Sequence, residues 1–202
     1  MDIILILIIA VVAILLVTFV PGLFNKEDGP KMPGKAKTGL GSGKLTRMVS
    51  HFALRRQYKV LGPCRFEKDG QTAEVDCVLI GYFGVLALKS VGRNGEVYGG
   101  VNDDEWLQVV KDARIKFENP FNECARAIPL MRDRLEAAKV RGVFLECMPV
   151  STYKKAQLAV PKSAGLLKLS EFSLLLEKQK YMEDKGVDLE KVAAALKPCE
   201  IK

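Results

Sequence analysis

Apolar residues fill the beginning of the chain almost without interruption. From Ile3 to Val20 the only polar residue is Thr18. As a helix these 18 residues span about 27 Å, close to the ~30 Å hydrocarbon core of a bilayer. A cleaved signal peptide, the alternative, would need a basic N-terminal region, whereas Asp2 precedes the apolar segment. Residues 1–24 are therefore predicted to form one transmembrane anchor whose partner is the lipid bilayer.

After the anchor, the spacing of apolar residues changes several times. Residues 25–43 are rich in Gly, Pro and Lys and are predicted to be a basic, flexible linker. Beyond the linker, segments with helical spacing are separated by short apolar or alternating runs typical of strands. The predicted helices cover residues 44–57, 120–139, 171–180 and 189–197. The predicted strands cover residues 58–66, with an interruption near Gly62 and Pro63, and residues 73–80, 85–90, 96–99, 105–110, 143–150 and 157–160.

Several residues mark the ends of these elements. Asn119 and Pro120 open the long middle helix, and Pro129 is expected to bend it. Ser170 and Asp188 are the predicted N-caps of the two last helices. The order of helix, strands, helix and strand predicts one α/β or α+β domain over residues 44–202.

The charge of the chain is concentrated beside the apolar segment. The chain has 31 Lys and Arg against 24 Asp and Glu, a formal net charge of +7, which favours anionic partners. Residues 25–63 alone hold nine basic and two acidic residues. By the positive-inside rule, this predicts a single-pass protein of the cell membrane with its C-terminal domain in the cytoplasm. Binding of the basic stretch to anionic headgroups is an additional hypothesis.

The cysteines and the single histidine argue against a zinc site. The five cysteines are widely spaced without a C-x-x-C motif, and no zinc-type spacing involves His51. They are predicted to be reduced and mostly buried thiols. They are Cys64, Cys77, Cys124, Cys147 and Cys199.

Charged residues on two neighbouring predicted strands suggest phosphodiester chemistry. Glu74 and Asp76 are two residues apart, as are Ala87 and Lys89, so each pair shares a face of its strand. A carboxylate that holds Mg²⁺ beside a lysine that stabilises phosphate charge is the minimum of a metal-dependent phosphodiesterase site. Charged residues on the solvent side of a hairpin would give the same pattern, and that alternative stays open.

A set of motifs in a fixed order makes the first interpretation more specific. Residues 43 to about 134 resemble a nuclease-related (NERD) domain, a branch of the PD-(D/E)xK restriction-endonuclease-like nucleases. The resemblance implies a mixed central sheet flanked by helices. It also implies Asp76 and Lys89 as catalytic residues and Asp76 as a metal ligand, with Mg²⁺ as cofactor if the protein is active and no small-molecule cofactor. The motifs are the helix opened by Gly43, E-V-D-C-V-L-I, G-Y-F-G-V-L-A-L-K-S, G-E-V-Y-G, Trp106 and Asn119-Pro120.

The sequence departs from the family pattern at positions that bear on catalysis. Ala87 stands where the family usually has the Glu of Glu-x-Lys, and Lys44 stands where an acid commonly follows the first glycine. Glu123 and Ala127 occupy the positions of a usual Gln and His. Because a lone carboxylate holds Mg²⁺ weakly, we predict a catalytically impaired nuclease fold that acts as a binding module. The alternative is an active Mg²⁺-dependent nuclease in which Glu74 or Glu123 supplies the lost ligand.

Four further residues are candidates for contact with nucleic acid. Trp106, the only tryptophan, is expected to pack in the core, and the alternative is an exposed indole that stacks on a base. Arg126, Arg132 and Arg134 on the middle helix are candidates for phosphate contacts, with a solvated helix face as the alternative. Nucleic acid and a protein at the membrane both remain candidate partners.

Overall fold

The computed structural model describes residues 41–201, apart from the side chain of Ser163. The predicted transmembrane anchor and most of the linker therefore lie outside the described residues. Within residues 41–201, no helix combines the length and the apolar character that a membrane span requires.

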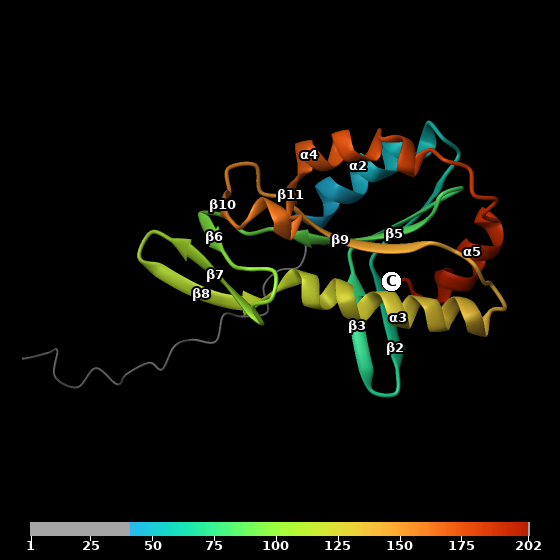
Figure 1. Cartoon of the computed structure of the whole chain (residues 1–202), viewed down its shortest axis with the longest axis horizontal. Coiled ribbons are helices and arrows are strands. Elements are labelled where there is room, and N and C mark those ends of the chain that lie inside the picture. Colours follow the sequence, from blue (N-terminus) through green and yellow to red (C-terminus); the bar gives the residue numbers. More distant parts are fainter. Residues whose placement is uncertain (1–40, 202) are drawn as a thin grey trace, which may run out of the picture. The chain divides into compact units, whose positions relative to one another are not determined.

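A five-stranded mixed sheet forms the centre of the domain (Figure 1). Its strand order is β1-β4-β5-β9-β11. Neighbours among the first three strands are antiparallel, whereas β9 runs parallel to β5 and β11 runs parallel to β9. The strands are β1 (Lys59–Leu61), β4 (Cys77–Gly81), β5 (Gly84–Val91), β9 (Leu145–Ser151) and β11 (Leu167–Lys168).

Helices cover both faces of this sheet (Figure 1). One face carries α2 (Ser42–Leu54) and α4 (Leu169–Leu176), and the other carries α3 (Pro120–Ala137) and α5 (Leu189–Leu196). Every residue of β4 is buried, as expected for a strand covered on both sides. The predicted mixed α/β domain is confirmed at this level.

Two smaller β-structures extend from the central layers. The hairpin of β2 (Cys64–Lys68) and β3 (Gln71–Val75) packs against α3, and its tip projects beyond that helix (Figure 1). A four-stranded sheet has the order β10-β6-β7-β8. Its strands are β10 (Gln157–Ala159), β6 (Glu96–Tyr98), β7 (Glu105–Val110) and β8 (Ala113–Glu118), and the three short 3-10 helices are Lys162–Ala164, Gln179–Tyr181 and Lys197–Cys199.

Some predicted boundaries are wrong. The predicted strand 73–80 is interrupted at Asp76, which separates β3 from β4. The predicted helix 171–180 instead begins at Leu169 and ends at Leu176, with Lys168 rather than Ser170 at its N-cap position. The N-cap at Asp188 is confirmed, because its carboxylate accepts a 3.0 Å hydrogen bond from the backbone N–H of Lys191.

The buried cysteines allow a test of the core. Burial raises the pKa of Cys77 to about 12, so the thiol stays protonated at pH 8. We expect Cys77 to resist a thiol reagent in the folded protein and to react in denaturant, as measured by mass spectrometry. The Cys77 thiol ionises at a lower pH in the unfolded chain than in the folded protein. The contribution of Cys77 to the free energy of unfolding should therefore fall as pH rises from about 9 to about 12. Rapid labelling of Cys77 in native buffer would contradict this burial.

Candidate functional site

Asp76 lies at an irregularity between two strands. In a regular strand, residues 75 and 77 point to the same face. Here Val75 packs on the side of α3 and Cys77 on the side of α2, so the alternation shifts by one residue at Asp76. The backbone N–H of Asp76 still donates a 2.8 Å hydrogen bond to the carbonyl of Leu88 on β5. The regular alternation from which we predicted a shared face for Glu74 and Asp76 therefore does not hold.

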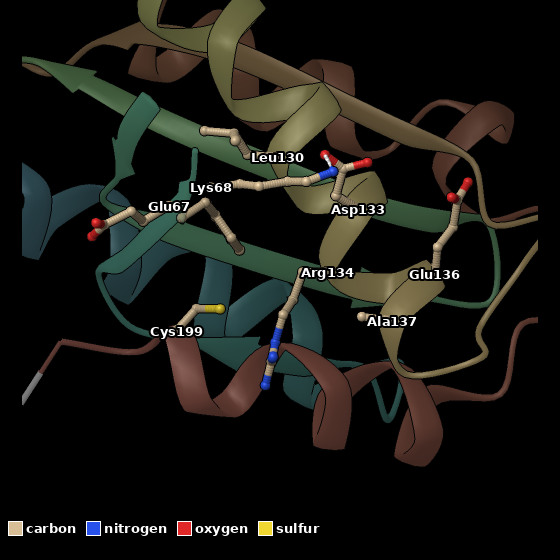
Figure 2. Close-up of a pocket in the computed structure, with 9 residues that line it drawn as sticks. Glu67, Lys68, Leu130, Asp133, Arg134, Glu136, Ala137 and Cys199 are labelled. Carbon is tan, nitrogen blue, oxygen red and sulfur yellow. Dashed lines mark hydrogen bonds and ion pairs between the residues drawn. The ribbon is translucent and has the colours of Figure 1, made fainter. Parts of the chain in front are cut away.

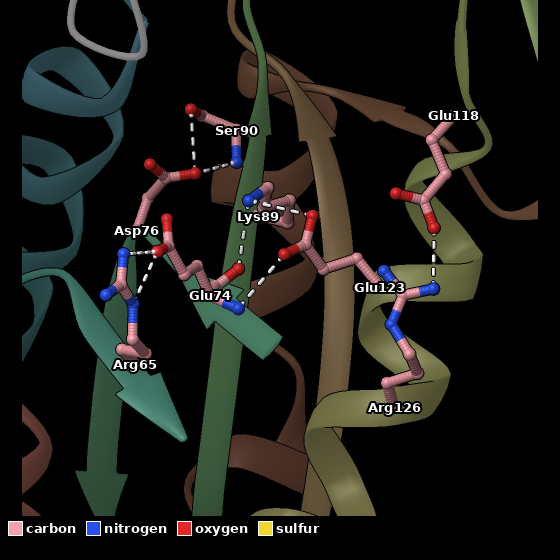
Figure 3. Close-up of polar contacts among 8 residues, drawn as sticks. All are labelled: Arg65, Glu74, Asp76, Lys89, Ser90, Glu118, Glu123 and Arg126. Carbon is pink, nitrogen blue, oxygen red and sulfur yellow. Dashed lines mark hydrogen bonds and ion pairs between the residues drawn. The ribbon is translucent and has the colours of Figure 1, made fainter. Parts of the chain in front are cut away.

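The carboxylate of Asp76 is bound by a residue that the sequence reasoning missed. Its Oδ2 accepts hydrogen bonds from the backbone N–H of Ser90 at 2.7 Å and from the Ser90 hydroxyl at 2.9 Å (Figure 3). The Asp76 residue is only 8% exposed. The signal was present in the tight turn between β4 and β5, because the register that it sets pairs Cys77 with Leu88 and so brings residue 76 close to the residues that follow Leu88.

Lys89 is enclosed by a network that joins β3, β5 and α3. Its Nζ lies 3.0 Å from Glu123 Oε2 and donates a 2.9 Å hydrogen bond to the backbone carbonyl of Glu74. The other oxygen of Glu123 accepts from the backbone N–H of Glu74 at 3.0 Å. The side chains of Lys89 and Glu123 are 17% and 20% exposed. The positive charge of Lys89 is thus matched inside the protein (Figure 3).

The start of α3 positions Glu123. Asn119 caps this helix by accepting a 3.0 Å hydrogen bond from the backbone N–H of Phe121, and Pro120 occupies its first position. These residues fix where the helix begins, so Glu123 lies in its first turn. There it faces Lys89. The side chain of Glu74 turns outward instead and pairs with Arg65, whose Nε donates a 2.7 Å hydrogen bond to Glu74 Oε1 (Figure 3).

This donor set does not fit a Mg²⁺ site. Mg²⁺ binds carboxylates with free oxygens and keeps several waters in a near-octahedral shell. Both oxygens of Glu123 and one oxygen of Asp76 already accept hydrogen bonds or an ion pair within the protein. Within residues 41–201, no group of three or more Asp, Glu, His or Cys residues could hold a metal ion.

A pocket opens beside this network. It has a volume of about 230 Å³ and lies between the end of β5 and the start of α3. Lys89, Ser90 and Glu123 line it together with Arg93 and Glu118. The guanidinium of Arg93 is held 4.4 Å above the ring of Phe117. The wall of the pocket therefore carries both positively and negatively charged side chains.

Trp106 is buried, as core packing requires, so its indole is not available to stack on a base in this structure. The residue is 1% exposed, and its Nε1 donates a 2.9 Å hydrogen bond to the carbonyl of Gly100. Phe117 and Phe121 contact the indole ring at centroid distances of 6.2 and 5.9 Å. Core packing is therefore its role in this structure.

The burial of Trp106 predicts the fluorescence of the protein. As the only tryptophan, it should emit at the short wavelengths of an apolar environment and resist quenching by acrylamide. Addition of an oligonucleotide should leave the spectrum of the full chain unchanged, because no face of the indole can meet a base. Strong quenching by the oligonucleotide would show that the indole becomes accessible.

The three arginines of α3 do not form one cluster. Arg126 pairs with Glu118 at 2.6 Å, and Arg132 is exposed. At about 100° per residue, Arg132 and Arg134 point to nearly opposite sides of the helix. Arg134 instead lines a pocket of about 340 Å³ near Cys199 (Figure 2). Its Nε donates a 3.1 Å hydrogen bond to the carbonyl of Ala195.

Comparisons with known proteins agree with the motifs that surround this site. The chain is 26% identical over 98 residues to an uncharacterized protein of Bacillus anthracis. That alignment covers 48% of this chain and 44% of the relative, so the chain spans less than half of the relative's length. No solved structure matches the chain. The model of the nuclease-related domain (NERD) family matches residues 42–152, more than half of the chain and the whole network around Asp76, Lys89 and Glu123, so this protein belongs to the NERD family.

Proposed function

We propose that this protein is a membrane-anchored module with a restriction-endonuclease-like fold that binds nucleic acid without cleaving it. The observation that carries the proposal is the closed network at the site. Lys89 is paired with Glu123, and Asp76 is bound by Ser90. The groups that a nuclease would turn toward a phosphate are here engaged with one another.

Physical chemistry explains why such a site would not cleave. A lysine stabilises phosphate charge only if its own charge is not already compensated, and a metal needs carboxylate oxygens that are free to bind it. The site also lacks the acid of the Glu-x-Lys motif, because Ala87 takes that position and is fully buried in the core under α3. No neighbouring residue of β5 therefore replaces the lost carboxylate.

The distribution of charge and hydrophobicity supports the anchor and the anionic partner. The apolar run from Ile3 to Val20 is long enough to span a bilayer. The nine basic residues of residues 25–63 would lie on the cytoplasmic side by the positive-inside rule. A domain held there would meet nucleic acid at the inner face of the cell membrane.

The test uses the full chain in lipid nanodiscs. Labelled single- and double-stranded DNA and RNA are incubated with it in Mg²⁺, in Mn²⁺ and in chelator. We expect no cleavage, and binding that weakens steeply as salt increases. If the protein binds none of these four nucleic acids, the proposal of a nucleic-acid partner is wrong, and a protein partner is left.

A second candidate function is an active nuclease, and one observation favours it. Glu123, a predicted substitute for the missing acid, reaches Lys89 from α3. If metal-dependent cleavage is found and is lost in both Asp76→Ala and Glu123→Gln, the binding-only proposal is wrong. Asp133→Asn, which breaks an exposed ion pair with Lys68 farther along the same helix, is the matched control and should leave any cleavage unchanged.

A further inference from the structure

A second pocket lies on the opposite side of the central sheet from α3. It has a volume of about 420 Å³ and is formed where α2 begins, β9 ends and α4 begins. Figure 1 shows α2 and α4 side by side on this face. The pocket shares no lining residue with the 230 Å³ pocket beside Lys89. It is therefore a separate feature of the domain, and we call it the lysine pocket.

The charge of the lysine pocket is uniformly positive. Lys44, Lys154 and Lys168 line it, and no described Asp or Glu does. None of the three ammonium groups forms an ion pair with any residue in the described part of the chain. This differs from Lys89, whose charge is matched by Glu123. The lysine pocket thus holds three cations that are available to an anion.

Two hydroxyl groups in the wall of the pocket have no partner. Ser151 and Thr152 are 2% and 5% exposed, and neither hydroxyl oxygen has a hydrogen-bond partner in the described structure. A buried hydroxyl without a partner costs free energy, so such groups are normally satisfied by protein, water or ligand. An oxygen-rich ligand in the pocket would supply acceptors for both.

The start of α2 adds to the attraction for an anion. This helix has Gly41 at its N-cap, no side-chain cap and no acidic residue in its first turn, where Lys44 lies instead. A Cβ added at Gly41 would collide with the hydroxyl of Thr152, so this hydroxyl lies directly against the helix start. An N-terminus carries partial positive charge, and a lysine there is unfavourable unless an anion is present. The start of α4 differs, because Glu171 already binds its N-cap N–H at 2.8 Å.

We propose that the lysine pocket binds a phosphate monoester attached to an organic group. Three uncompensated lysines, two free hydroxyls and an uncapped helix start suit the several oxygens and the double charge of such a phosphate. The rest of the wall holds the apolar Met48 and Leu169 together with Ser170 and Ser173, and Tyr153 is half-exposed beside it. That wall suits either the base of a nucleotide or the glycerol portion of a lipid headgroup.

The test is calorimetric titration of the full chain in nanodiscs with inorganic phosphate, adenosine 5′-monophosphate and glycerol 3-phosphate. We expect all three to bind, and the two organic phosphates to bind more tightly than inorganic phosphate. Tighter binding of the nucleotide assigns the pocket to nucleotides, and tighter binding of glycerol 3-phosphate assigns it to lipid headgroups. No binding of any of the three would overturn the proposal.

Variants separate a ligand site from a structural feature. Lys44→Gln and Lys168→Gln should each weaken binding at least tenfold. Thr152→Val, which removes only the hydroxyl, should weaken binding several-fold without loss of thermal stability. Lys116→Gln on β8, an exposed lysine paired with Glu105 far from the lysine pocket in the chain, is the control and should bind as the wild type does. Unchanged binding in Lys44→Gln and Thr152→Val would contradict the proposal, whatever the nucleic-acid assays show.

Discussion

Replacing Asn119 with alanine should lower the free energy of unfolding by about 3 kcal/mol. The residue is fully buried and makes bonds in two directions. Its amide oxygen caps α3 through the N–H of Phe121, and its amide nitrogen donates to the carbonyls of Val101 at 3.0 Å and Asp103 at 2.8 Å. Alanine would leave the helix uncapped and these two carbonyls without the donor that Asn119 supplies.

Urea unfolding followed by circular dichroism measures this effect, and Asp188→Ala provides its control. Asp188 also caps a helix, but only through one hydrogen bond at the exposed start of α5. Its removal should cost about 1 kcal/mol. If both variants lose the same free energy of unfolding, the hydrogen bonds from Asn119 to the loop before β7 contribute nothing. The cap alone would then account for the stabilisation by Asn119.

Replacing Glu123 with alanine should cost about 2–3 kcal/mol of stability. The variant leaves the mostly buried ammonium of Lys89 without its counter-charge and the N–H of Glu74 without an acceptor. Glu123→Gln should cost less, because the amide oxygen can still accept from that N–H. Urea unfolding of both variants gives the two values, and equal losses would show that charge compensation is the larger contribution.

A double-mutant cycle isolates the pair of charges. Combining Glu123→Gln with Lys89→Met should recover most of the stability lost in Glu123→Gln, because neither charge then remains buried alone. The matched control is the exposed pair of Glu105 and Lys116, whose coupling should lie within about 0.5 kcal/mol of zero. A coupling between Glu123 and Lys89 as small as this control would mean that solvent screens the site.

The central layers of the fold follow from the sequence because their patterns are strong. Leu45, Val49 and Phe52 recur at helical spacing and are buried together on α2. The apolar run that begins at Val85 is buried in β5 as predicted. The strand β8 was not predicted, although Ile115 and Phe117 alternate with charged residues; it lies at the edge of its sheet, and none of its residues is fully buried. Its turn also gives no sequence signal, since Lys111 rather than glycine takes the positive φ of 54°.

The site was less predictable, because its geometry depends on contacts between distant segments. Sequence spacing placed Asp76 and Lys89 on neighbouring strands, which the register of β4 and β5 agrees with. It could not show that Glu123, 34 positions after Lys89, would return from α3 to pair with it. Nor could it show the shift in alternation at Asp76, because each residue on both sides of it is compatible with one continuous strand.

That shift at Asp76 also bears on how the length of the chain can vary in evolution. The residues before it and after it reach the core only because the alternation changes there, so losing or gaining one residue would turn one strand's apolar side chains toward the wrong face. The tip of the β2–β3 hairpin, at Asp69 and Gly70, is exposed and extends past α3 (Figure 1). Insertions and deletions among related proteins should therefore gather at this tip and spare the few residues around Asp76.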